Sequence, residues 1–141
     1  MNARRVLAGF VVLILAATAA GLPGVASAGS IEGKTFLIKG GETGAKMDQD
    51  DMLTFIDGKF HSTGCDPYGF GDGMYTVGGD GNATTFDAET LSEKEGRMKW
   101  HGVVAGDSIE GTFTWYKKPK WYRIFGKDTV EYSYTGKLKA P

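Results

Sequence analysis

An alternation of apolar and polar residues between positions 95 and 116 constrains the fold of this chain most strongly. Met98 and Trp100 alternate with charged or basic side chains, and beyond a short turn Phe113 and Trp115 alternate with threonines. A period of two residues is typical of strands with one buried and one solvated face. Two such runs around a turn rich in glycine and aspartate predict a β-hairpin. The strands predicted here are 95–104 and 108–116.

The same pattern recurs along the rest of the chain, and no segment has a convincing helical apolar period. Asp57-Gly58 and the glycine-rich segment 78–82 separate further pairs of alternating runs, as hairpin turns do. The remaining predicted strands are 31–39, 52–56, 59–63, 74–77, 84–90 and 129–139, which makes eight in all.

Eight consecutive strands, with a tight turn at every second connection, predict an all-β fold: an antiparallel up-and-down β-barrel, whose closure removes exposed sheet edges. A Greek-key sandwich is the alternative, and it needs long crossovers between sheets. Connections in a meander alternate between two ends, so the long segments 40–51, 64–73, 92–95 and 117–128 share one end. We therefore expect a cup with a mouth, large enough for a packed core or one small ligand.

The first 28 residues have the features of a signal peptide. Arg4 and Arg5 precede an apolar run over 6–20, and Ala26-Ser27-Ala28 supplies a cleavage site. The run is shorter than the ~20 residues of a spanning helix, so no transmembrane segment is expected in the mature chain. This predicts a signal peptide at 1–28, a single barrel domain at 29–141, and a periplasmic or secreted protein.

Charge and cysteine content exclude several classes of protein. Without Arg4 and Arg5 the mature chain has 14 basic and 17 acidic residues, a net charge of −3, which argues against nucleic-acid binding. Cys65 is the only cysteine, so it is buried, a candidate reactive thiol, or a contact to another chain. It has no metal-ligand spacing to His61 or His101, and no acid–base pair accompanies it. We predict no metal, no cofactor and no enzymatic activity.

Large aromatic side chains dominate the inward faces of the predicted strands, where they either fill the barrel or line a pocket with flat walls. Gly102 and Gly111 leave space among them, which favours a pocket. A buried phenol also needs a polar partner. We predict that the apolar part of a ligand lies on Trp100, Trp115, Tyr132 and Tyr134.

Two of the predicted mouth loops carry further candidate ligand-binding residues. In 64–73, glycines flank Tyr68 and Phe70, which predicts a lid that packs onto the barrel beside Cys65. In 117–128, cations lie beside aromatics and could hold an anionic group, or they form an ordinary solvated loop. The candidates in this basic segment are Lys118, Trp121 and Arg123. A polar end of the ligand is expected near Lys118, Arg123 or Asp66.

The strand count, hairpin turns and clustered long loops resemble the calycins, the lipocalin-like and avidin-like eight-stranded barrels. Many lipocalins have Gly-x-Trp on the first strand, whereas this chain has Gly33-Lys34-Thr35-Phe36 there. The resemblance implies a cavity for a small, mostly apolar molecule and transfers no residue-level site. We therefore expect an exported protein that binds a hydrophobic or amphipathic molecule. The alternative is a packed scaffold or interaction protein of the cell envelope, with its mouth loops and Cys65 contacting a protein partner.

Overall fold

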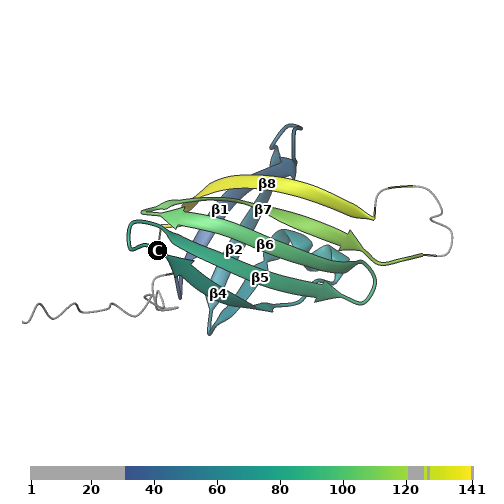
Figure 1. Ribbon diagram of the computed structural model, residues 1–141, viewed down its shortest axis with the longest axis horizontal. Coiled ribbons are helices and arrows are strands. Elements are labelled where there is room, and N and C mark those ends of the chain that lie inside the picture. Colours follow the sequence, from purple (N-terminus) through teal and green to yellow (C-terminus); the bar gives the residue numbers. More distant parts are fainter. Residues whose placement is uncertain (1–30, 121–125, 127, 141) are drawn as a thin grey trace, which may run out of the picture.

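Eight antiparallel strands form a closed barrel in which β1 lies between β2 and β8 (Figure 1). This computed structural model describes residues 31–120, 126 and 128–140, so the predicted signal peptide at 1–28 lies outside the described residues. The strands are β1 (Thr35–Glu42), β2 (Gln49–Ile56), β3 (Lys59–Ser62), β4 (Gly73–Gly79), β5 (Thr84–Ser92), β6 (Gly96–Ala105), β7 (Ser108–Lys117) and β8 (Thr129–Leu138). A 3₁₀ helix, η2 (Thr63–Tyr68), follows β3.

The pairing of the first and last strands closes the barrel. β1 and β8 are in register from Phe36↔Leu138 to Glu42↔Tyr132, and every other strand pairs with its neighbours in sequence. Among the described strands there is no crossover connection, so the predicted up-and-down barrel is confirmed over the Greek-key sandwich.

The connections alternate between two ends, as the sequence predicted. Tight turns at 57–58, 80–83 and 106–107 form one end, which we call the closed end. Asp57 and Gly58 both have positive φ, as a hairpin turn of matching twist requires. The connections 43–48, 63–72 and 93–95 form the other end, the mouth, where β7 also ends and β8 begins.

The boundaries predicted around segment 40–51 were wrong. The segment 40–51 is not a loop throughout, because β1 continues to Glu42 and β2 starts at Gln49. The Gly40-Gly41 pair does not break the strand. A Cβ at Gly41 would lie 2.2 Å from the Lys46 carbonyl oxygen, so glycine permits a close approach of two backbones here.

The start of the domain plugs the closed end instead of forming strand from residue 31. Ile31 is fully buried, and the Gly33 amide donates to the Phe55 carbonyl at 2.5 Å. The Glu32 carboxylate accepts hydrogen bonds from Tyr75 Oη at 2.5 Å and from the Gly58 amide at 2.9 Å. These bonds lower the pKa of Glu32, while burial, followed by the bond to Glu32, raises the pKa of Tyr75.

Aromatic rings fill the closed half of the barrel. Phe55 is central, with ring centroids 4.8–6.1 Å from those of its aromatic neighbours. The contacts continue from Phe60 to Trp100 at 4.9 Å and from Trp100 to Tyr134 at 5.7 Å. These rings are buried and packed against one another. The neighbours of Phe55 are Phe36, Phe60, Tyr75 and Phe86.

The glycine pair on β6 and β7 makes room for a tyrosine and not for a ligand. Cβ atoms on Gly102 and Gly111, which are in register, would lie 2.5 and 2.6 Å from Tyr134 Oη. That hydroxyl donates to the His101 carbonyl at 2.9 Å. The pocket that we inferred from Gly102 and Gly111 is therefore filled by Tyr134.

Candidate functional site

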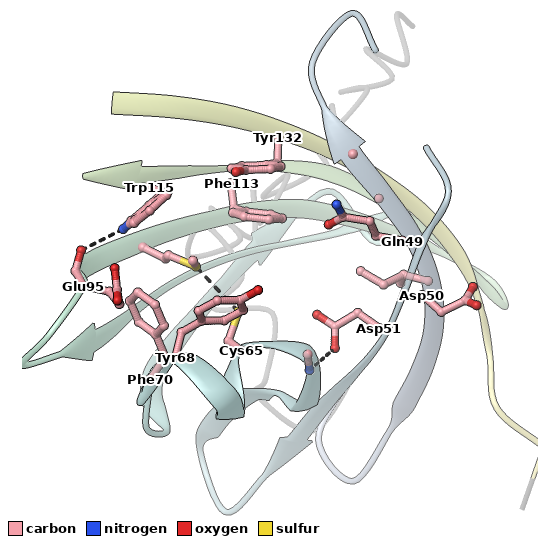
Figure 2. A pocket seen from close by; sticks show the side chains of 15 residues that line it. Gln49, Asp50, Asp51, Cys65, Tyr68, Phe70, Glu95, Phe113, Trp115 and Tyr132 are labelled. Atoms are coloured by element: carbon pink, nitrogen blue, oxygen red, sulfur yellow. Dashed lines mark hydrogen bonds between the residues drawn. The ribbon is translucent and has the colours of Figure 1, made fainter. Parts of the chain in front are cut away.

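A cavity of about 270 Å³ opens at the mouth (Figure 2). Strands β1, β2, β6, β7 and β8, helix η2 and the residues that follow it all contribute to its walls. The lining residues are Ile38, Gly40, Gly41, Gln49, Asp50, Asp51, Gly64, Cys65, Tyr68, Phe70, Glu95, Met98, Phe113, Trp115 and Tyr132.

One wall is a stack of aromatic rings on β7 and β8. Phe113 and Tyr132 are in register, with ring centroids 4.7 Å apart and planes within 8° of parallel. Phe113 also stacks on the buried Trp100 at 4.0 Å, so the stack runs from the packed core to the mouth. Trp115 extends this wall toward the rim, where its Nε1–H donates to the Glu95 carbonyl at 2.8 Å. Unlike the buried rings below them, these wall rings are only half-buried.

The facing wall is a lid, which we define as residues 63–72. It exists because β3 has only four residues and pairs with β4 at just two positions, Lys59↔Met74 and Phe60↔Gly73. Helix η2 ends at Gly69, whose φ of 79° is the left-handed conformation that favours glycine. The lid brings Cys65, Tyr68 and Phe70 to the cavity, as Figure 2 shows.

Asp51 on β2 fixes the start of the lid. Its carboxylate accepts hydrogen bonds from the Gly64 amide and the Met52 amide, both at 2.6 Å, and from the Ser62 hydroxyl. A Cβ at Gly64 would lie 2.9 Å from this carboxylate, so glycine permits the close approach. Asp51 therefore combines an anchoring role with a place in the cavity wall.

His61 holds the lid from the outer face of β3. Its Nε2 lies 2.9 Å from an Asp66 oxygen, and its Nδ1 lies 2.7 Å from an Asp72 oxygen. Because Phe60 and Ser62 on either side are buried in the barrel, His61 faces outward and away from Cys65. In the part of the chain that the structure describes, no group of three or more histidine, cysteine or acidic residues could hold a metal ion.

Cys65 is a buried residue that lines the cavity. It is 8% exposed; its sulfur lies 3.2 Å from Ser62 Oγ, whose proton goes to Asp51, and its thiol faces Met98 Sδ at 3.7 Å. Burial, the largest cause, raises the pKa of the thiol to about 11, even though the contact with Ser62 acts in the opposite direction. At neutral pH the group is a protonated thiol, whereas the nucleophile and disulfide-forming species is the thiolate.

The structure brings only some of the predicted ligand-binding residues together. Trp115, Tyr132, Tyr68 and Phe70 line the cavity with Cys65. Trp100 and Tyr134 are 2% and 1% exposed and belong to the packed core.

The residues predicted to receive the polar end of a ligand are elsewhere. Lys118 does not line the cavity, and its Nζ donates to the Glu93 carbonyl at 2.5 Å. Asp66 is likewise absent from the lining and contacts His61. Trp121 and Arg123 lie outside the described residues.

Several lining residues were missed in the sequence. The alternation pattern predicts that Phe113 and Met98 face the barrel interior, but it does not assign them to a site. Gln49 and Asp51 were placed in a loop, and Glu95 in a connector or the start of a strand. The signal that could have found Asp51 is its alternation with Leu53 and Phe55, which places all three on the inner face of β2.

No family model, curated protein or solved structure matches this chain. Among the described residues, no helix is long and apolar enough to cross a membrane.

Proposed function

We propose that this chain is an exported binding protein that holds one small hydrophobic or amphipathic molecule in the mouth half of its barrel. The observation that carries the proposal is the cavity of about 270 Å³, walled by Phe113, Trp115 and Tyr132, which face inward and remain half-buried. Covering such rings removes apolar surface from water and is favourable. A largely apolar pocket with a few polar groups is the usual form of a small-molecule site.

The size and shape of the cavity limit the ligand. An apolar cavity of ~150 Å³ holds one benzene ring, so about 270 Å³ suits a molecule of roughly two fused rings. Phe113 and Tyr132 stack with nearly parallel faces, and we expect a flat ligand group to extend this stack. A small, flat molecule therefore fits better than a long acyl chain.

The proposed location rests on the first 28 residues. Their basic start, apolar run and Ala26-Ser27-Ala28 site support export with cleavage, to the periplasm or out of the cell. The ligand would then be met outside the cytoplasm.

Native mass spectrometry of the protein purified from its own export compartment tests the binding proposal. We expect a native mass above that of the polypeptide and an excess that disappears on denaturation. The excess also identifies the ligand by mass. A native mass equal to that of the bare chain, together with no uptake of small aromatic probes, would instead favour the packed scaffold.

Two neighbouring residues on β7 offer a matched pair of variants. Trp115 lines the cavity, whereas Tyr116 lies on the outer face, with its ring 4.6 Å from the Arg97 guanidinium. Trp115→Ala removes apolar wall and is expected to weaken retention of the ligand at least tenfold, while Tyr116→Ala is expected to retain it. Equal losses in the two variants would show that the mouth cavity is not the binding site.

A further inference from the structure

The charged side chains that line the mouth cavity are all acidic. They are Asp50, Asp51 and Glu95, and no lysine, arginine or histidine lines it among the described residues. Asp50 is neutralised from outside, because its carboxylate pairs with Lys39 Nζ at 2.7 Å on the exposed surface. The other two carboxylates have no cationic partner in the part of the chain that the structure describes.

Asp51 contributes a fixed negative charge. Its oxygens are held by the Met52 and Gly64 amides and by the Ser62 hydroxyl, which are neutral donors and leave the charge uncompensated. Glu42, at the end of β1, adds to the negative potential near the mouth. Its charge, after burial as the larger cause, raises the pKa of Tyr132.

Glu95 is the carboxylate best placed to receive a ligand group. Its backbone is fixed, because its carbonyl accepts hydrogen bonds from Trp115 Nε1 at 2.8 Å and from the Lys118 amide at 3.0 Å. Its half-buried carboxylate has no hydrogen-bond or ion-pair partner among the described residues. In Figure 2 Glu95 lies at the edge of the cavity beside Trp115, so an acid and an aromatic ring face the same space.

Aromatic rings beside an acid suit a cation for two reasons. A carboxylate pairs with a protonated amine, and the face of an indole or phenol ring attracts positive charge. Trp115 already draws one cation: Lys117 Nζ, which does not line the cavity, lies 5.4 Å from its ring centroid.

Given the proposed function, on which this step rests, we infer that the ligand is an aromatic or otherwise flat apolar amine that binds as a cation. Its rings pack against Phe113, Trp115 and Tyr132, and its ammonium group lies toward Glu95. The sequence alone placed the polar end of the ligand near Lys118, Arg123 or Asp66 and so left its charge open.

Calorimetric titration of the exported protein with three naphthalene derivatives tests this inference. Naphthylmethylammonium, naphthylmethanol and naphthoate, substituted at the same ring carbon, are similar in size and differ in charge. We expect the ammonium to bind roughly tenfold more tightly than the alcohol, as for a partly solvated charge-assisted contact, and the carboxylate to bind most weakly. The preference for the ammonium is expected to shrink as salt is added.

Glu95→Gln and Glu93→Gln form a matched pair in the same connection. Both remove one negative charge, but Glu93 does not line the cavity. Glu95→Gln is expected to bring the affinities for the ammonium and the alcohol within about threefold of each other. Glu93→Gln is expected to retain the preference.

Two results would overturn the charge inference alone: the alcohol or the carboxylate binds at least as tightly as the ammonium, or both glutamine variants abolish the preference equally. If none of the three compounds binds, the proposed function fails together with the inference. The two failures are therefore distinguishable.

Discussion

The closed half and the mouth half of this barrel are built from the same kind of inward-facing residue, yet only one half is filled. Toward the closed end, Phe55 and Phe60 are fully buried, and the Ile31–Gly33 turn seals the opening. Toward the mouth, Phe113 and Trp115 occupy equivalent inward positions and remain half-buried around a cavity. The rings in the two halves are similar in kind. We therefore attribute the difference in their burial to the segments that cover the two ends of the barrel.

Each end is covered by a different device. The closed end is plugged by Glu32, which is hydrogen-bonded to Tyr75 and Gly58, and by Tyr134, whose hydroxyl occupies the space over Gly102 and Gly111. The mouth is covered by a lid that replaces strand pairing where β3 ends, and the lid leaves space beneath it. The mouth cavity therefore lies where the sheet is locally incomplete.

The largest expected effect comes from truncating a ring in each half. Phe60→Ala in the closed half is expected to lower the free energy of unfolding by about 3–5 kcal/mol, because the site is fully buried and packed on three rings. Phe113→Ala in the mouth wall is expected to lower it by about half as much, because that ring is only half-buried. Chemical denaturation measures both. Equal losses of unfolding free energy in the two variants would contradict the difference in packing between the two halves.

A second test adds a methyl group in each half. Gly111→Ala would place its Cβ 2.1 Å from the His101 carbonyl oxygen, and we expect a loss of about 1–3 kcal/mol or more from overpacking. Gly71→Ala in the lid meets nothing within 4 Å and is expected to change stability by less than about 0.5 kcal/mol. Thermal unfolding of the two variants compares them, and a tolerated Gly111→Ala would show that the closed half is loosely packed.

Alkaline pH is expected to destabilise the closed half through its phenols. Burial, with a smaller contribution from Asp87, raises the pKa of Tyr134, so the folded state keeps a proton that the unfolded chain loses near pH ~10. This stabilisation is fully present below that pH and falls by about 1.4 kcal/mol per pH unit above it. In this alkaline range, Tyr134→Phe should make the free energy of unfolding less dependent on pH by the contribution of one proton, about 1.4 kcal/mol per pH unit. An unchanged slope would show that Tyr134 ionises normally.

The last prediction concerns the rate at which Cys65, beneath the lid, is chemically labelled. With a thiol pKa of about 11, raised from an ordinary value of 9.0, the thiolate fraction near neutral pH is about 100-fold below that of an unperturbed cysteine. Alkylation of the native protein by iodoacetamide should therefore be at least about 100-fold slower than alkylation in denaturant. Labelling of the native protein at the denatured rate would mean that the lid is open.

Much of the fold follows from sequence, because strand periodicity and turn chemistry are local. The alternation around Trp100 and the Asp57-Gly58 turn predicted the strands, their antiparallel order and the two kinds of end. The lid boundaries did not follow, because η2 forms only where β3 and β4 separate, and that separation depends on the register of distant strands.

The site was less predictable for a physical reason. Period-two alternation shows which face a side chain occupies and not how far along the barrel axis the interior is filled. Trp100 and Trp115 therefore looked equivalent, although one is core and the other lines the cavity. Likewise, the space at Gly102 and Gly111 is taken by Tyr134 from the neighbouring strand, a contact visible only once β7 and β8 are in register.

The indole N–H resonances of Trp115 and Trp100 test the central claim most directly, because Trp115 lines the cavity and Trp100 is buried in the packed core. Titration of ¹⁵N-labelled protein with naphthylmethylammonium, with the signals assigned by Trp→Phe variants, should shift the Trp115 resonance strongly and the Trp100 resonance much less. A Trp115 resonance that stays fixed while the probe binds, or a larger shift at Trp100, would contradict a hollow mouth above a packed closed half.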